Sequence, residues 1–263
     1  GGFSTHNNSV GYYNNFFTEI IIVIGMLLAS LPFTLYISFL RRKYSIFHDS
    51  QVLLFLSLIT IFILALAIWI HIENNLDILI ALRLALFNGI SVMTGTGFST
   101  ENFSNWGSFS NTLLLTMMFI GGCSGSTTGG LKIFRIQILF LIIIKELKTI
   151  RSPRSVTSIN YKNDYINDQV INSVMLIILC FIASIFIITS LFTYYGYDFI
   201  TSISAAITSV FVVGPGLGHI IGPSESFTQL PNILKYTLSI GMIVGRLEFL
   251  TFLIILVPKF WTK

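Results

Sequence analysis

The sequence predicts an all-α polytopic membrane protein of repeated helix–loop–helix units, with about five spanning helices and two shorter re-entrant helices. The first indication is composition: 54% of the 263 residues are hydrophobic and only 10% are charged, whereas soluble domains carry about a quarter charged residues. The second is a set of apolar runs long enough to cross a bilayer. The third is a recurring order of long run, short run and glycine turn. A soluble or disordered chain is excluded, so the net charge of +4 is best interpreted loop by loop.

Four apolar runs have the roughly 20 residues that a hydrocarbon core of about 30 Å requires. They cover residues 16–40, 52–70, 170–195 and 233–257. A fifth candidate at 113–144 is interrupted by the glycine-rich stretch Gly121–Gly130. Two further apolar segments, 78–92 and 199–213, are too short or too polar to span and run into glycine turns. We expect these two segments to dip into the membrane and return.

The distribution of Lys and Arg predicts the orientation, because cytoplasmic loops near spans collect these residues. The basic residues that follow the first, interrupted and last runs are Arg41, Arg42, Lys43, Lys145, Lys148, Arg151, Arg154, Lys162, Lys259 and Lys263. The opposite loops, 71–77 and 193–198, contain no Lys or Arg. We therefore expect the basic loops and the C-terminus to be cytoplasmic, with Gly1 starting outside.

The order of elements repeats along the chain. One cycle of long helix, short helix, glycine turn and returning helix covers about 51–150, and a second covers about 168–258. Residues 1–43 contain only a glycine turn and its returning helix. Repeats on this scale indicate a pseudo-symmetric assembly rather than separate domains.

Three glycine turns occupy matching positions in this scheme. They are Gly1–Thr5, Thr94–Thr100 and Val212–Gly218. Non-helical backbone survives at membrane depth only inside protein or beside a wet cavity, and glycine lets a turn aim several carbonyls to one side. Rings of carbonyls replace the hydration shell of a potassium ion. A single turn could equally serve to reverse a re-entrant hairpin, but three matching turns favour an ion path.

These segments resemble a known family. Gly1–His6, Thr96–Thr100 and Gly214–Gly218 are similar to successive filter segments of the bacterial TrkH potassium-uptake subunits, and Gly121–Lys132 and Gly245–Glu248 are similar to two further family segments. The resemblance covers essentially the whole chain. It implies the C-terminal portion of a potassium-channel-like protein with four repeats, of which the first repeat and the outer and pore helices of the second are absent.

The resemblance also implies a division of the chain and a set of ion-binding residues. Residues 1–43 would end the second repeat, 44–155 would form the third with its interrupted inner helix, and 156–263 would form the fourth. The shared filter glycines would be Gly2, Gly97 and Gly214. The carbonyls just before them would line the potassium path and belong to Gly1, Gly95, Thr96, Val212 and Val213.

The run Gly121–Gly130 holds five glycines and is too costly in backbone entropy for a plain membrane helix. A phosphate-binding loop is rejected because Gly130-Leu131-Lys132-Ile133 lacks the required Gly-Lys-Ser/Thr. Close helix packing by small residues is an alternative. In the resembled family this segment is an intramembrane loop that obstructs the pore and moves to open it. The gate and pore residues would then be Gly121, Gly122, Gly125, Gly129, Gly130, Lys132 and Arg246.

Charged residues inside spans are costly and mark functional positions. Arg246 and Glu248 lie within the last run, and two residues at this spacing do not share a helix face, so each needs its own partner. Their alternative role is buried pairing between helices. The resemblance places an arginine like Arg246 near the pore below the filter. Arg135 could reach the cytoplasmic face, and Arg83 is expected to be structural or interfacial.

Taken with the resemblance, the sequence predicts potassium uptake across the bacterial inner membrane through a channel-like pore, with no enzymatic activity and no cofactor on this chain. The implied partners are a second copy of the chain, a cytosolic TrkA-type nucleotide-binding subunit reached through the basic loop 145–162, and the polypeptide that supplies the missing repeats. One alternative is a sodium- or proton-coupled symporter, which Glu19 and Glu248 alone would have to serve as intramembrane carboxylates. Another is an inactive fragment of such a transporter.

Overall fold

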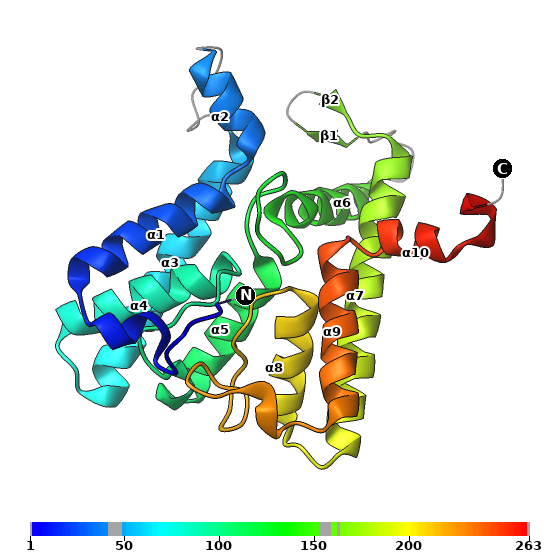
Figure 1. Ribbon diagram of the computed structural model, residues 1–263. Coiled ribbons are helices and arrows are strands. Elements are labelled where there is room, and N and C mark those ends of the chain that lie inside the picture. Colours follow the sequence, from blue (N-terminus) through cyan, green and yellow to red (C-terminus); the bar gives the residue numbers. More distant parts are fainter. Residues whose placement is uncertain (1, 42–48, 153–158, 162–163, 262–263) are drawn as a thin grey trace.

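The computed structural model describes residues 2–41, 49–152, 159–161 and 164–261 (Figure 1). Helices dominate the described residues, and the strands β1 (Asn160–Tyr161) and β2 (Asp164–Tyr165) form one short antiparallel hairpin. The helices are α1 (Phe16–Ser30), α2 (Phe33–Leu40), α3 (Ser50–Asn74), α4 (Ile78–Met93), α5 (Ser108–Ile120), α6 (Ile133–Arg151), α7 (Asp168–Tyr194), α8 (Phe199–Val210), α9 (Asn232–Arg246) and α10 (Leu250–Leu256). The expected all-α class is confirmed.

Two helices, α3 and α7, are each long and apolar enough to cross a membrane, with a mean hydropathy of 2.9. Both lack Gly and Pro, and both begin at a side-chain cap. The Asp49 carboxylate accepts a hydrogen bond from the Gln51 amide, and the Asn167 side chain accepts one from the Gln169 amide. Such caps satisfy amides that the first helical turn leaves unpaired. The spans predicted at 52–70 and 170–195 are therefore continuous helices.

The predicted span at 16–40 is not one straight helix, because α1 and α2 together are apolar enough to cross a membrane but meet at a bend of 91°. Pro32 lies at the bend, and proline supplies no amide hydrogen and clashes with the preceding helical turn. The predicted span at 233–257 is also broken, because α9 ends at Arg246 and α10 begins at Leu250. Glu248 lies in this break with φ 53°. Figure 1 shows α2 and α10 turning away from α1 and α9.

The two short helices pack against the long helices that precede them, α4 on α3 and α8 on α7. The connections are tight, with Asn75 and Gly196 in the left-handed region. The glycine turns follow directly after Met93 and Val210, as the sequence predicts. The three-part division of the chain stays a prediction.

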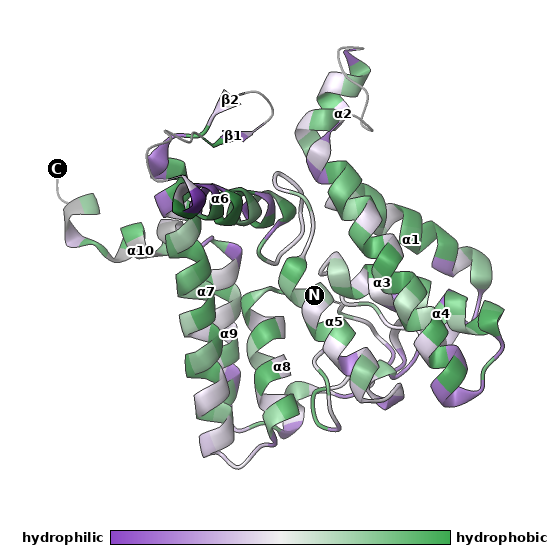
Figure 2. Cartoon of the chain, turned by 180° about the vertical axis from the view of Figure 1, so that it is seen from behind, coloured by the Kyte–Doolittle hydropathy of each residue, from purple (hydrophilic) through white to green (hydrophobic). Residues whose placement is uncertain are grey.

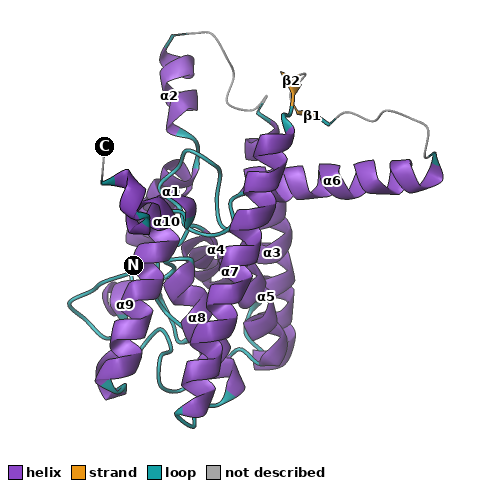
Figure 3. Cartoon of the chain, turned by 90° about the vertical axis from the view of Figure 1, so that its right-hand side faces the viewer, coloured by secondary structure: helices purple, strands orange, loops and turns teal. Residues whose placement is uncertain are grey.

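The interrupted run forms α5, a non-helical loop and α6. Figure 3 shows α6 lying across the direction of α7 instead of continuing alongside it. Its first turns pack with the β-hairpin and α7 in a small cluster around Ile138, Ile166 and Val174. Figure 2 shows that most residues of α1, α3 and α7 are hydrophobic. Many of their apolar side chains are exposed in the chain alone, which fits contact with lipid.

Candidate functional site

The three glycine turns meet at one place in the fold. A methyl group at Gly2 would lie 2.0 Å from the Gly97 carbonyl oxygen, and one at Gly97 would lie 2.5 Å from the Val213 carbonyl oxygen. The φ angles of Gly2, Gly97 and Gly214 are 66°, 82° and 118°. All three φ angles favour glycine, and at Gly2 and Gly97 the neighbouring backbone also lies too close for a side chain.

The second and third turns are folded back on their short helices in the same way. The Thr96 amide donates to the Ser91 carbonyl oxygen at 3.0 Å, and the Val213 amide donates to the Thr208 carbonyl oxygen at 2.9 Å. Both bonds join residues five apart and turn the amides toward the helix. Among the described residues, no hydrogen bond ends on the carbonyl oxygen of Gly95, Val212 or Val213. These oxygens are therefore available to a cation.

A cavity of about 550 Å³ lies against the three turns. Gly2, Gly97 and Gly214 contribute to its wall, together with residues of the segment 222–228, which precedes α9. Lys235 at the start of α9 also lines it, and its ammonium donates to the Thr228 carbonyl oxygen at 2.8 Å. The cavity therefore brings open space directly against the glycines of all three turns.

The loop between α5 and α6, hereafter the glycine loop (121–132), presses against the ends of the short helices. A methyl group at Gly129 would lie 1.8 Å from the Phe211 carbonyl oxygen, and one at Gly95 would lie 3.6 Å from the Gly129 amide nitrogen. In Figure 1 the loop lies on the side of the turns that faces α2 and α6. The loop therefore lies against the second and third turns, and the cavity of about 550 Å³ is lined by none of its residues.

The conformation of the glycine loop depends on its glycines. Gly121, Gly125 and Gly130 have φ angles of 71°, 78° and 82°, which other residues adopt only at a cost. Within the loop, the Ser126 hydroxyl donates to the Cys123 carbonyl oxygen at 2.6 Å. Gly122 has no space for a side chain, because Thr128 lies against it. The loop is a compact ordered structure rather than a frayed helix.

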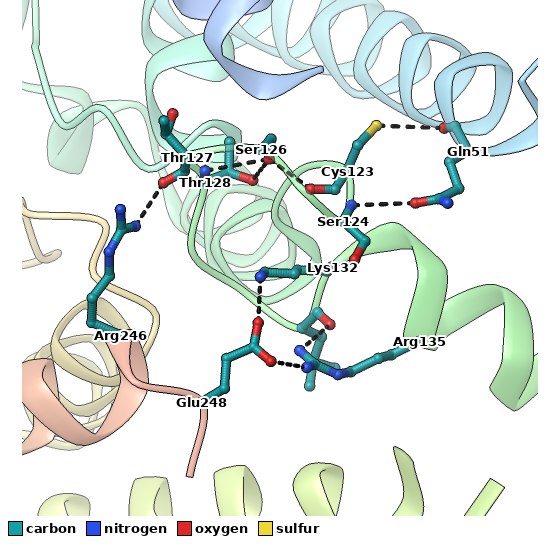
Figure 4. A network of polar contacts seen from close by, with 11 residues as sticks. Gln51, Cys123, Ser124, Ser126, Thr127, Thr128, Lys132, Arg135, Arg246 and Glu248 are labelled. Carbon is teal, nitrogen blue, oxygen red and sulfur yellow. Dashed lines mark hydrogen bonds and ion pairs between the residues drawn. The ribbon is translucent and has the colours of Figure 1, made fainter. Parts of the chain in front are cut away.

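Charged side chains tie the glycine loop to the break between α9 and α10 (Figure 4). Arg246 donates to the Thr127 carbonyl oxygen at 2.7 Å. Glu248 accepts from Lys132 through one carboxylate oxygen and from Arg135 through the other, the latter at 2.6 Å. Arg246 and Glu248 therefore have different partners, as their spacing predicts. Arg135 is buried and is engaged by Glu248 rather than exposed at a surface.

The family comparison agrees with this arrangement. The family model for TrkH, described as a cation transport protein, matches residues 1–263. The chain belongs to the TrkH family.

Its relatives include several Trk system potassium uptake proteins. It is 37% identical over 267 residues to TrkI of Halomonas elongata and 32% identical over 268 residues to TrkH of Escherichia coli K12. Each alignment covers 100% of this chain and 54% of the relative, so the chain spans about half the length of the curated relatives it matches. These names describe transport and not enzymatic catalysis.

A solved structure shows the same fold. The crystal structure of the potassium transporter TrkH from Vibrio parahaemolyticus superposes on this chain with a TM-score of 0.89 and 30% identity, covering 99% of this chain and 56% of that one. The predicted TrkH resemblance is thus confirmed.

The expected site residues fall into two groups in this TrkH-family chain. Gly2, Gly97 and Gly214 lie together at the turns, with Gly95, Thr96, Val212 and Val213 directly preceding the latter two glycines. The second group belongs to or contacts the glycine loop and comprises Gly121, Gly122, Gly125, Gly129, Gly130, Lys132 and Arg246. Gly1 lies outside the described residues, as do Arg42, Lys43, Arg154, Lys162 and Lys263.

Sequence reasoning missed the contacts that the α1–α2 bend makes with the glycine loop. The Thr127 amide donates to the Ala29 carbonyl oxygen, and the Phe33 amide donates to the Gly125 carbonyl oxygen. Pro32 was the available signal, since an internal proline breaks a helix and releases backbone groups.

Proposed function

We propose that this chain forms most of a potassium-uptake pore, in which backbone carbonyls of the glycine turns bind dehydrated potassium. The observation that carries the proposal is the meeting of three glycine turns whose carbonyls at Gly95, Val212 and Val213 accept no hydrogen bond from the described residues. Such carbonyls replace the water that an ion loses on entry. The short helices α4 and α8 add the partial negative charge of their C-terminal ends.

The glycine loop is the proposed gate. It lies under the turns, where Gly129 contacts the backbone of Phe211, and Arg246 holds it through the Thr127 carbonyl. A loop in this position obstructs an ion that leaves the turns on the cytoplasmic side. Lys132 and Arg246 also place positive charge near the path, which opposes a cation until the loop moves.

The remaining parts of the pore come from outside this sequence. Three glycine turns leave one quadrant of a four-part ring open, and the chain spans about half of its relatives. The missing polypeptide supplies the fourth filter segment in this proposal. We further propose an inner-membrane location with cytoplasmic basic loops, a homodimeric assembly and a cytosolic TrkA-type regulatory subunit, for which the relatives' Trk system names give support.

A carboxylate-coupled symporter fits less well. Glu19 is bound by Arg83 through two hydrogen bonds of 2.7 Å, and Glu248 is bound by Lys132 and Arg135. A carboxylate that carries a coupling ion must be able to exchange its partner, and both of these are held by cationic side chains.

Rubidium uptake in cells that lack their own potassium import tests the proposal. The compared forms are this chain alone, this chain joined to the N-terminal half of a family member, and the joined form with Gly97→Asp. We expect uptake only by the joined, unsubstituted form, since Gly97 has no room for a side chain. Uptake by the chain alone would show that it builds its own ring, and no uptake by any well-expressed form would contradict potassium transport.

A further inference from the structure

The bend between α1 and α2 is joined to the glycine loop by hydrogen bonds, three of them between backbone groups and one from a side chain. Four bonds connect the two segments: Cys123 N to Ser30 O at 3.2 Å, Thr127 N to Ala29 O at 3.3 Å, Thr127 Oγ1 to Ala29 O at 3.1 Å and Phe33 N to Gly125 O at 3.0 Å. The loop thus donates hydrogen bonds to the last carbonyl oxygens of α1 and accepts one from the first amide of α2. The backbone groups left unpaired at the bend find their partners in the loop.

These groups are available because the helix is broken at Pro32. A helix end leaves its last carbonyls and first amides without partners inside the helix. In a helix that continued through the bend, the Phe33 amide would donate to the Ala29 carbonyl oxygen, four residues earlier. In the bent structure, the Phe33 amide instead donates to Gly125, and the Ala29 carbonyl oxygen instead accepts from Thr127. A straight helix and the contact with the glycine loop therefore compete for these two backbone groups.

The bend has its own internal support. The Tyr36 hydroxyl donates to the Leu28 carbonyl oxygen at 2.5 Å, and the Leu31 amide donates to the same oxygen at 3.3 Å. Pro32 marks the bend of 91°. Tyr36 and the bonds to the loop occupy the carbonyls and the amide that the break exposes.

We propose that the α1–α2 bend is a latch that positions the glycine loop. In the bent state the four bonds keep the loop under the turns. When the bend opens, Phe33 N and Ala29 O pair with each other, and Gly125 and Thr127 lose their partners. Movement of α2 would thereby release the loop without leaving these two helix groups unpaired. The latch rests on the proposed gating role of the loop. It assigns the regulation of that gate to the helix pair α1 and α2, which precedes the loop in the chain by about 80 residues.

The test uses the full-length protein that contains this chain, in lipid nanodiscs and in proteoliposomes. Spin labels at Ile24 and Ile37, which are both exposed and lie on α1 and α2, report the bend as a distance. Deuterium uptake over 121–131 reports the loop. Pro32→Ala restores an amide at the bend, and Tyr36→Phe removes the hydroxyl that supports it. Pro231→Ala, at the start of α9, is the matched control.

We expect Pro32→Ala to lengthen the distance between the labels and to speed exchange in the loop, with rubidium flux rising by roughly threefold to tenfold, the effect of losing one or two backbone bonds. Tyr36→Phe should act in the same direction with a smaller effect, and it carries the test if Pro32→Ala does not fold. Pro231→Ala should change neither the distance nor the exchange.

The outcomes separate the latch from the gate. If both substitutions lengthen the distance and loosen the loop while flux stays constant, the latch stands and the gating role of the loop is wrong. If the distance grows and loop exchange stays at the level of Pro231→Ala, the bend does not hold the loop and the latch is overturned. Unchanged distance and unchanged exchange in both variants would overturn it as well.

Discussion

Arg246, the last residue of α9, donates a hydrogen bond to the carbonyl oxygen of Thr127 at 2.7 Å, across 119 positions of sequence. The contact joins the last helix pair to the middle of the glycine loop. A guanidinium on a backbone carbonyl is stronger than a neutral pair, because the donor carries charge. One side chain therefore both restrains the loop and places a positive charge beside it.

Replacement of Arg246 tests this restraint. Arg246→Gln should raise rubidium flux through the full-length protein in proteoliposomes by roughly tenfold, since a hydrogen bond to a charged group contributes about 1.5 kcal/mol or more. Lys148→Gln, at an exposed position near the end of α6, is the control for a lost positive charge. Equal flux in the two variants would remove Arg246 from the gating mechanism.

The close contact between Gly129 of the glycine loop and the end of α8 predicts that a larger residue at this position displaces the loop. Gly129→Ala adds a methyl group that would lie 1.8 Å from the Phe211 carbonyl oxygen, so the loop must shift away from α8. We expect higher flux and faster deuterium exchange over the glycine loop. Gly25→Ala, whose methyl group would meet nothing within 4 Å, should behave as the unsubstituted protein. If Gly129→Ala matches that control, the loop is not held against α8.

The ion pair between α1 and α4 should contribute to stability. Glu19 is 6% exposed, while the Arg83 side chain is 34% exposed, so Arg83→Met leaves a buried carboxylate without its partner. We expect a loss of roughly 2 kcal/mol, less than for a fully buried pair. The double variant Glu19→Leu with Arg83→Met should recover most of the lost Tm in detergent. A double variant that melts no higher than Arg83→Met would contradict this.

The carboxylate of Asp198, just before α8, should make the stability of the protein depend on pH. Burial alone would raise the pKa of its carboxylate, but hydrogen bonds from Thr201 and the charge of His219 outweigh burial and hold the pKa below its ordinary value. The carboxylate therefore contributes stability above the unfolded pKa of about 4, and this is lost as pH falls through the lower folded pKa. Between about pH 5 and pH 3, Tm should fall less for Asp198→Asn than for the unsubstituted protein. Parallel curves would rule out this contribution.

The local sequence pattern was enough to predict the two long helices and the turns that follow the two short ones. The helices α3 and α7 follow from 25 and 27 residues without Gly or Pro. The turns after α4 and α8 follow from short apolar runs that end at glycine. In each case the neighbouring residues decide the backbone, so no distant contact is needed.

The breaks depend on distant partners and were predicted less well. At the bend of 91° near Pro32, the glycine loop bonds to the exposed groups of both helices. The break at Glu248 has no proline or glycine within it, and its carboxylate reaches Lys132 and Arg135 across more than 110 positions. Pairings at such separation leave no local signal in a single sequence. The repeat pattern indicated a shared ion path for the three turns, and the family resemblance singled out Gly2, Gly97 and Gly214 within them.

The most direct measurement of the central claim, that the glycine turns form a potassium-selective path, is the ratio of rubidium to sodium flux in proteoliposomes of the full-length protein. The compared forms are unsubstituted, Gly97→Ala and Gly25→Ala. A methyl group at Gly97 would press on the Val213 carbonyl oxygen at 2.5 Å and strain a φ of 82°, so the ratio should fall toward one in Gly97→Ala and stay high in Gly25→Ala. Equal, high ratios in both variants would show that the turns do not select the ion.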